Sequence, residues 1–204
     1  IDSDDGQPRL LRSGVLSKYL VEQGHDVTWF NSTFDHTHKI HREKKTTFRK
    51  INNLKLVLLR GYGYRKNISL MRFLDHSKLA FEFIKVSKKL KKPDIILCSM
   101  PPLELCAASI FYKNKNKVPV IFDIRDLWPD VFLTVFPKPI AKLFKFLFFW
   151  QYLLLKYSLE NASALIGISP KYLEWADRIN NSINEKYKKV IPLGYYFEEC
   201  KSQE

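Results

Sequence analysis

The amino-acid sequence predicts an α/β fold: a doubly wound, mostly parallel sheet flanked by helices. The first observation behind this prediction is that short apolar runs alternate with longer segments whose apolar residues recur at helical spacing, as in strand–helix–strand crossovers. The second is that 46% of the 204 residues are hydrophobic, an ordinary proportion for a globular protein with a sizeable core. The third is that the sequence contains no internal repeats and no low-complexity tracts.

The chain opens part-way into a crossover unit. Residues 1–6 have the composition of a loop, and residues 8–23 are predicted to form a helix because a proline suits the first turn and a glycine follows the last. A strand over residues 26–30 completes the unit. We therefore expect residues 1–204 to form one domain whose first strand is missing.

The remaining elements follow the same alternation. Apolar runs predict strands over residues 54–59, 94–99, 118–122, 164–168 and 190–193. Helical spacing predicts helices over residues 69–91, 103–112, 137–161 and 170–179. The polar, basic segment 35–50 is expected to be a solvated or anion-facing loop. A metal site there is not favoured, because no carboxylate or cysteine stands at metal-ligand spacing from its three histidines.

The charge balance predicts an anionic partner. The net charge is +13 and the pI is about 9.6, which suits nucleic acid, phosphorylated small molecules or anionic lipid. No nucleic-acid-binding motif accompanies the charge, so nucleic acid is not favoured. The three cysteines have no metal-ligand spacing, and Cys98 and Cys106 are expected to be buried thiols in a reducing compartment.

The segment 137–161 has an unusual composition for a helix. In one continuous helix Lys142, Lys145 and Lys156 would share a narrow sector, and almost every other residue is apolar. The apolar run is too short and too interrupted to span a membrane. One apolar face would pack on the sheet and the other would meet a partner domain or a membrane interface, unless the whole helix is sandwiched inside the domain.

The predicted strand 118–122 is followed by charged residues that look like a site. Asp123, Arg125 and Asp126 come directly after the strand, and ligands of open parallel sheets bind at the carboxyl ends of strands. The alternative is a structural ion pair backed by the Trp128-Pro129 turn.

Motifs along nearly the whole chain resemble the N-terminal half of a family-four, GT-B type glycosyltransferase, from the branch that builds bacterial surface polysaccharides. The matching pieces are Gly24-His25-Asp26-Val27-Thr28, Asp35-His36, Tyr64-x-x-Asn67-x-Ser69-x-x-Arg72, Pro93-Asp94-Ile95-Ile96, Pro101-Pro102-Leu103-Glu104-Leu105, Asp123-Ile124-Arg125-Asp126-Leu127-Trp128-Pro129-Asp130, Ala164-Leu165-Ile166-Gly167-Ile168-Ser169 and Ile191-Pro192-Leu193-Gly194. The Asp-Ile-Arg-Asp-Leu-Trp-Pro stretch is the most specific of them.

The resemblance implies a Rossmann-like half of a GT-B architecture. In that family the N-terminal half binds the acceptor, often a glycan on a polyprenyl diphosphate, and a C-terminal half holds the nucleotide-sugar. Only ten residues follow Gly194, so we expect an isolated acceptor domain that lacks its donor-binding partner and is inactive by itself. The expected enzyme is a retaining hexosyl- or N-acetylhexosaminyltransferase that needs no cofactor and works at the inner face of the cytoplasmic membrane.

The resemblance also assigns roles to residues, although caps, tyrosine packing and surface charge are the structural alternatives for them. Asp126 would be catalytic and orient the acceptor hydroxyl. The acceptor-binding residues would be His36, Arg42, Tyr64, Asn67, Arg72 and Arg125. Gly6 and Arg9 would lie on the donor-phosphate side, and Asp123, Ser99 and Ser169 would support the site. One rival function is a non-catalytic binding module with a basic face for a polyanion or partner protein. The other is a domain that binds nucleic acid through charge alone.

Overall fold

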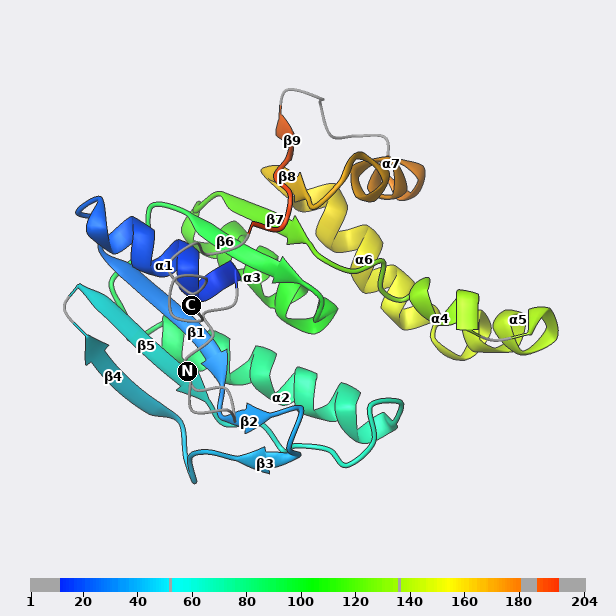
Figure 1. Ribbon diagram of the computed structural model, residues 1–204, viewed down its shortest axis with the longest axis horizontal. Coiled ribbons are helices and arrows are strands. Elements are labelled where there is room, and N and C mark those ends of the chain that lie inside the picture. Colours follow the sequence, from blue (N-terminus) through cyan, green and yellow to red (C-terminus); the bar gives the residue numbers. More distant parts are fainter. Residues whose placement is uncertain (1–11, 52, 136, 181–186, 195–204) are drawn as a thin grey trace, which may run out of the picture. The chain divides into compact units, whose positions relative to one another are not determined.

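A computed structural model describes residues 12–51, 53–135, 137–180 and 187–194 (Figure 1). The chain divides into two compact units. Unit 1 comprises residues 1–65 and 193–204, and unit 2 comprises residues 66–192. Each unit has its own hydrogen-bonded sheet.

Unit 1 begins with the helix and the strand that the sequence predicts. Helix α1 (Arg12–Glu22) leads into β1 (Val27–Ser32), which pairs in parallel with β5 (Leu54–Leu59). Strand β4 (Thr47–Ile51) pairs with the other side of β5 in the antiparallel direction, which gives the order β1-β5-β4. The central strand β5 carries four consecutive buried residues, as is typical of a strand in the interior of a sheet.

The segment 35–50 is not the loop that we expected. It contains most of β4, and β2 (Phe34–Asp35) pairs with β3 (Ile40–His41) as a short antiparallel ribbon. The composition hid β4 because it is an edge strand whose last four residues are exposed, two of them basic. Charged side chains are ordinary on an edge strand, where they oppose pairing with another chain.

Unit 2 confirms the α/β fold class with a four-stranded parallel sheet. Its strands are β6 (Ile96–Met100), β7 (Val120–Ile124), β8 (Ala164–Gly167) and β9 (Lys188–Val190), in the order β6-β7-β8-β9. Its helices are α2 (Leu70–Ser87), α3 (Leu103–Asn116), α4 (Val131–Val135), α5 (Lys138–Leu147), α6 (Phe149–Asn161) and α7 (Pro170–Ile179). Helices and strands alternate through this unit as in Rossmann-like folds (Figure 1).

The core of unit 2 is built around β7. Val120, Phe122 and Ile124 are fully buried, and side chains of α3, α6, α7 and the neighbouring strands β6 and β8 complete the core cluster to which they belong. Cys98 and Cys106 lie in this core with their sulfur atoms 3.9 Å apart, which confirms the expectation of buried free thiols. The strand β7 begins two residues later than predicted and ends at Ile124, so Asp123 belongs to the strand itself.

The predicted helix 137–161 is two helices. The backbone leaves the helical conformation at Phe148, where φ is −107° and ψ is 23°, and this residue separates α5 from α6. The lysine sector predicted across both halves assumed one continuous helix, and that assumption is wrong. Large apolar side chains remain exposed around the break, namely Ile140, Leu143, Phe146, Leu147, Phe149 and Leu153. We call these six residues the apolar face.

Among the residues that the structure describes, no helix combines the length and the apolar character needed to cross a membrane.

Candidate functional site

The carboxyl ends of the parallel strands bring several predicted site residues to one edge of unit 2. The register pairs Ser99 of β6 with Asp123 of β7, and the backbone N–H of Arg125 donates to the carbonyl of Met100 across 3.0 Å. Ser169 lies just beyond β8, at the start of α7. Asp123, Arg125, Ser99 and Ser169 therefore share the edge at which ligands of parallel sheets bind.

Asp123 and Arg125 form an ion pair at this edge. Arg125 Nε donates to Asp123 Oδ2 across 2.8 Å, and the side chains are 24% and 2% exposed, respectively. Asp123 is thus a buried support, whereas Arg125 reaches the surface. The ion pair is therefore compatible with a ligand site, because the buried carboxylate orients a guanidinium that stays partly exposed.

Asp126 is more accessible than Asp123. Its Oδ1 accepts a hydrogen bond from the backbone N–H of Leu127 across 2.8 Å, and the residue is half-buried. A carboxylate that is anchored on one side and open on the other can accept a hydrogen bond from a substrate hydroxyl. Within the described part of the chain, no group of three or more His, Cys, Asp or Glu side chains is placed to bind a metal ion.

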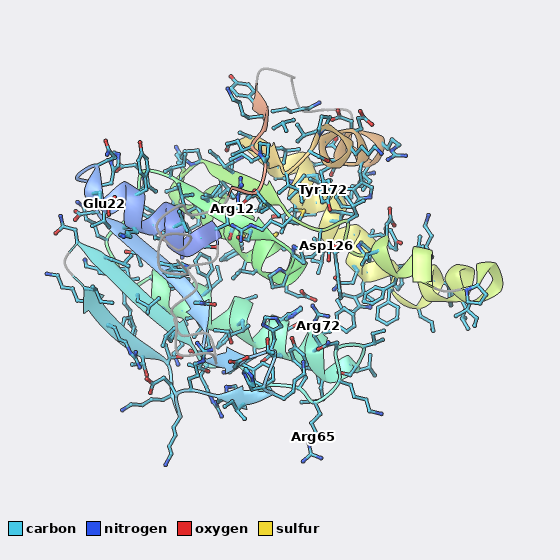
Figure 2. All side chains as sticks on the ribbon, in the orientation of Figure 1. Arg12, Glu22, Arg65, Arg72, Asp126 and Tyr172 are labelled. Atoms are coloured by element: carbon cyan, nitrogen blue, oxygen red, sulfur yellow. The ribbon has the colours of Figure 1, made fainter. Side chains whose placement is uncertain are left out.

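Arg72 meets the same loop through Trp128. The guanidinium carbon of Arg72 lies 4.7 Å from the centre of the Trp128 ring, a stacked cation–π contact. Arg72 Nη1 also donates to the carbonyl of Asn67 across 3.1 Å. The structure therefore brings the predicted acceptor-binding residue Arg72 to the loop that carries Asp126, and Asn67, another of the predicted residues, to Arg72 (Figure 2).

Behind Trp128 runs a set of polar residues that we call the buried polar chain: Trp128, Gln151, Glu104 and His76. Trp128 Nε1 donates to Gln151 Oε1 across 2.9 Å, and Gln151 Nε2 donates to Glu104 Oε1 across 2.6 Å. His76 Nδ1 lies 3.5 Å from Glu104 Oε2. The sequence interpretation missed this chain, although a glutamine in an otherwise apolar helical segment was a signal for it.

Asp130 ties the end of the loop to two helices. Its carboxylate accepts hydrogen bonds from the Tyr152 hydroxyl of α6 across 2.7 Å and from Trp175 Nε1 of α7 across 2.8 Å. Burial and the neighbouring Asp130 charge both raise the pKa of Tyr152 far above its ordinary value. The loop between β7 and α4 is thus fixed at both ends, which holds Asp126 in a defined backbone position.

The predicted residues of unit 1 gather at the β2–β3 ribbon. Arg42 Nη2 donates to Asp35 Oδ2 across 2.6 Å, so Arg42 is part of an ion pair. Tyr64 packs on Phe34 with ring centres 4.8 Å apart, and Lys39 Nζ lies 4.8 Å above the Tyr64 ring. His36 is exposed, and its carbonyl accepts a hydrogen bond from Lys39.

Asp35 is the electrostatic centre of this ribbon. Burial alone would raise the pKa of its carboxyl, but hydrogen bonds from the His38 side chain, from Arg42 and from the backbone N–H groups of His38 and Thr37 outweigh that effect. The net result is a pKa well below the ordinary value, so Asp35 is ionised at neutral pH.

Gly63 is required for the packing of the same ribbon. Its φ is +78°, and a Cβ atom placed there would come within 2.7 Å of His41 Nε2 and 3.0 Å of the Phe34 ring. A glycine both permits the left-handed backbone and leaves room for this approach. Gly6 and Arg9, the predicted donor-phosphate residues, lie outside the described residues.

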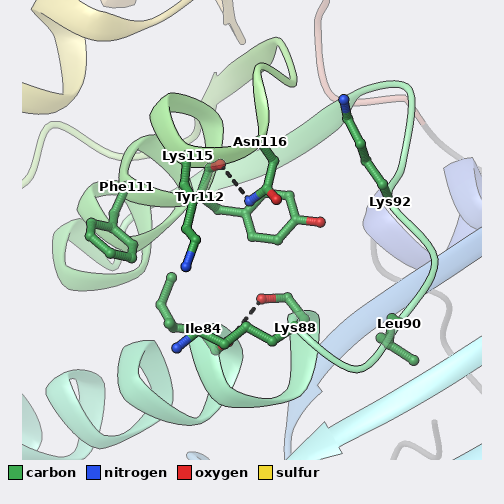
Figure 3. A pocket seen from close by; sticks show the side chains of 9 residues that line it. Ile84, Lys88, Leu90, Lys92, Phe111, Tyr112, Lys115 and Asn116 are labelled. Atoms are coloured by element: carbon green, nitrogen blue, oxygen red, sulfur yellow. Dashed lines mark hydrogen bonds between the residues drawn. The ribbon is translucent and has the colours of Figure 1, made fainter.

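A cavity of about 110 Å³ lies between the C-terminal turns of α2 and α3 (Figure 3). Its lining includes Lys88, Lys92, Lys115, Phe111 and Tyr112. Because α3 starts just after β6 and ends at this cavity, the cavity is at the opposite end of α3 from the loop of Asp126. Lysines at helix C-termini complement the carbonyl groups there, so we do not assign the cavity to the functional site.

Comparison with known protein families identifies a match. The family model of Glycosyltransferase Family 4 matches residues 15–196, which is most of the chain and includes every described residue of the site. A comparison with curated proteins finds no match.

Proposed function

Because this chain belongs to Glycosyltransferase Family 4, we propose that it is the acceptor-binding half of a retaining glycosyltransferase. The proposed reaction moves a hexosyl or N-acetylhexosaminyl group from a nucleotide-sugar to a lipid-linked or polysaccharide acceptor. The observation that carries the proposal is the clustering of Asp126, Arg125 and the Arg72–Trp128 stack around the loop at the carboxyl end of β7. The family membership establishes a glycosyltransferase domain, and the loop suggests which side of the reaction it serves.

Asp126 has the chemistry that an acceptor hydroxyl requires. The hydroxyl must be oriented toward the sugar and must lose its proton during transfer, and a carboxylate is a suitable hydrogen-bond acceptor for both purposes. Asp126 is anchored by the N–H of Leu127 and remains accessible. In this proposal Oδ1 keeps the backbone contact and Oδ2 receives the substrate hydroxyl.

The arginines have the chemistry that a phosphorylated acceptor requires. Retaining transfer passes through a state with oxocarbenium character, and negative charge develops on the leaving nucleoside diphosphate. A lipid-linked acceptor carries a diphosphate of its own, which must be bound. A guanidinium presents several N–H donors in one plane and can bind a phosphoryl group with two of them. Arg125 and Arg72 would hold the diphosphate of a lipid-linked acceptor, while the nucleotide-sugar would be bound by a donor half, with Gly6 and Arg9 on the donor-phosphate side.

The apolar face supports a peripheral position on a membrane. Six large apolar side chains are exposed on α5 and on the start of α6, and Phe146 is 75% exposed. Side chains of this kind can enter the boundary between headgroups and acyl chains, and the net charge of +13 would add attraction to anionic lipid. We propose that the enzyme binds the inner face of the cytoplasmic membrane, where a polyprenyl-linked acceptor for bacterial surface polysaccharide would be available.

The experiment that tests this function is a transfer assay with the complete enzyme. Radiolabelled nucleotide-sugars would be offered with a short-chain prenyl-diphosphate glycan, and the anomeric configuration of the product would be determined by NMR. We expect transfer with retained configuration. An inverted product would contradict the retaining mechanism, and polyanion binding without any transfer would favour the non-catalytic binding module instead.

A further inference from the structure

We propose that Gln151 and Glu104 are positioning residues for acceptor binding. They would act through Trp128, whose ring supports the Arg72 guanidinium. The inference rests on the proposed function, because it takes Arg72 as the group that binds a phosphoryl group of the acceptor. It adds that the buried polar chain sets the affinity of that site, although neither Gln151 nor Glu104 would touch the substrate.

The buried polar chain is not explained by stability alone. Gln151 is completely buried, and Trp128, Glu104 and His76 are each less than 10% exposed. A buried carboxylate is costly to desolvate, and replacing buried charged networks by apolar residues of similar size is often neutral or stabilising. Glu104 is helped here by its place in the first turn of α3, where the helix dipole favours a negative charge. What such a chain supplies beyond stability is a fixed orientation for its members.

The donor and acceptor groups of the chain permit only one arrangement of these hydrogen bonds. Trp128 Nε1–H can only donate, and the Glu104 carboxylate can only accept when ionised. The carboxamide of Gln151 must therefore turn its oxygen toward Trp128 and its nitrogen toward Glu104, as the structure shows. A flipped carboxamide would set donor against donor and acceptor against acceptor, so the rotation of the indole ring is determined from behind by Glu104.

The orientation of the indole in turn determines how Arg72 faces the site. The guanidinium carbon lies 4.7 Å from the ring centre, and Nη1 is held by the carbonyl of Asn67. Phe73 and Phe132 pack against the same indole, with ring centres 6.0 Å and 4.6 Å away, so the ring has close neighbours on other sides. A guanidinium supported in this way presents N–H groups at its edge without a further loss of side-chain freedom when an anion binds.

The test compares four variants of the full chain: Arg72→Ala, Gln151→Met, Glu104→Gln and Glu104→Leu. Equilibrium titrations would use geranyl diphosphate as a soluble prenyl diphosphate and a nucleoside diphosphate as the donor-side probe. Ser158→Ala is the matched control, since Ser158 is a fully buried polar residue of the same helix α6 and lies outside the buried polar chain. Circular dichroism of each variant checks that it folds.

We expect Arg72→Ala to weaken the binding of geranyl diphosphate by about tenfold or more, the effect of losing a charge-assisted contact. Gln151→Met and Glu104→Leu should weaken it by a smaller factor, about three- to tenfold, because they release the indole but leave Arg72 in place. Glu104→Gln keeps an oxygen that can accept from Gln151 Nε2, and it should restore most of the affinity. The double variant Arg72→Ala/Gln151→Met should bind no more weakly than Arg72→Ala, and Ser158→Ala should bind like the wild type.

The other outcomes contradict either the acceptor role of Arg72 or the positioning role of Gln151 and Glu104. If Arg72→Ala binds geranyl diphosphate normally, the acceptor role proposed for Arg72 is wrong and the inference falls with it. If Arg72→Ala weakens binding but Gln151→Met does not, or if the two effects simply add, the proposed function stands and the positioning role is wrong. If the nucleoside diphosphate responds in place of geranyl diphosphate, the site serves the donor. Should Gln151→Met fail to fold, Glu104→Leu and its double variant with Arg72→Ala are held to the same expectations.

Discussion

Arg125 donates through Nε to Oδ2 of Asp123 across 2.8 Å, from a position at the surface to a carboxylate that is almost completely buried. The unequal burial of the two partners has an energetic consequence. A buried carboxylate that loses its cation cannot be hydrated, whereas a guanidinium that is a quarter exposed can turn to water. Losing the ion pair should therefore cost more free energy when Asp123 is the partner that remains than when Arg125 remains.

This asymmetry predicts unequal effects of breaking the pair. Arg125→Met should lower the free energy of unfolding by about 3 kcal/mol or more, because it removes the cation that is paired with a buried carboxylate. Asp123→Asn should lower it by about 1–2 kcal/mol, because it removes the charge and keeps the volume. Urea denaturation of the two variants measures the difference, and a larger loss for Asp123→Asn would contradict the assigned burial.

The two left-handed glycines of unit 1 predict a second unequal pair. A Cβ at Gly63 would clash with His41 and Phe34, whereas a Cβ at Gly24, where φ is +86°, meets nothing within 4 Å. Gly24→Ala should cost only the backbone strain, about 1–2 kcal/mol. Gly63→Ala should cost about 3 kcal/mol or more, since crowding adds to the strain. Thermal unfolding of both variants measures the costs, and equal costs would show that the β2–β3 ribbon does not pack on Gly63.

The lowered pKa of Asp35 predicts a pH dependence of stability. A carboxyl whose folded-state pKa lies below its unfolded-state value stabilises the fold at pH values above the unfolded value, about 3.9, and that contribution is lost as pH falls toward the folded value. The destabilisation caused by Asp35→Asn should thus be full at pH 7 and shrink below about pH 4. Urea denaturation at several pH values measures it, with Asp26→Asn, an exposed position of the same unit, as the control. A destabilisation that does not change with pH would refute the electrostatic role of Asp35.

The apolar face predicts binding to vesicles. Phe146→Ser should weaken binding to vesicles that contain anionic phospholipid by about tenfold, because a buried phenylalanine contributes about 1.5–3 kcal/mol. Phe81→Ser is the control, since Phe81 is an exposed phenylalanine of α2 outside the apolar face. Sedimentation with vesicles at low salt measures both variants. Equal binding by the two would mean that the apolar face meets something other than lipid.

The strands of unit 2 could be predicted because buried strands are visible in the sequence as short apolar runs. β7 and β8 are short apolar runs beside turn residues, and the structure shifts their ends by two residues or fewer. β4 could not be predicted, because its side chains are mostly exposed and its strand character comes from hydrogen bonds to β5. The break at Phe148 had no local signal either, since neither proline nor glycine stands at that position.

The candidate site shows the same division. Asp123, Arg125 and Asp126 lie within four residues of one another at the end of a predicted strand, so local pattern was enough to predict their common place at the sheet edge. Trp128 meets Gln151 over a separation of 23 residues, and Gln151 meets Glu104 over 47. No local pattern encodes those distances, because they depend on the packing of α6 beside α3.

Asp126 lies at the reacting hydroxyl in the proposed function, and the turnover of Asp126→Asn in the complete enzyme tests this most directly. Asp130→Asn is the matched control, since it is the same change in the same loop at a carboxylate that holds Tyr152 and Trp175. We predict that Asp126→Asn lowers kcat by about a hundredfold or more with little change in melting temperature. Asp130→Asn should instead lower the melting temperature, and it should lower kcat by a smaller factor than Asp126→Asn does. Near-normal turnover by Asp126→Asn would contradict the central claim.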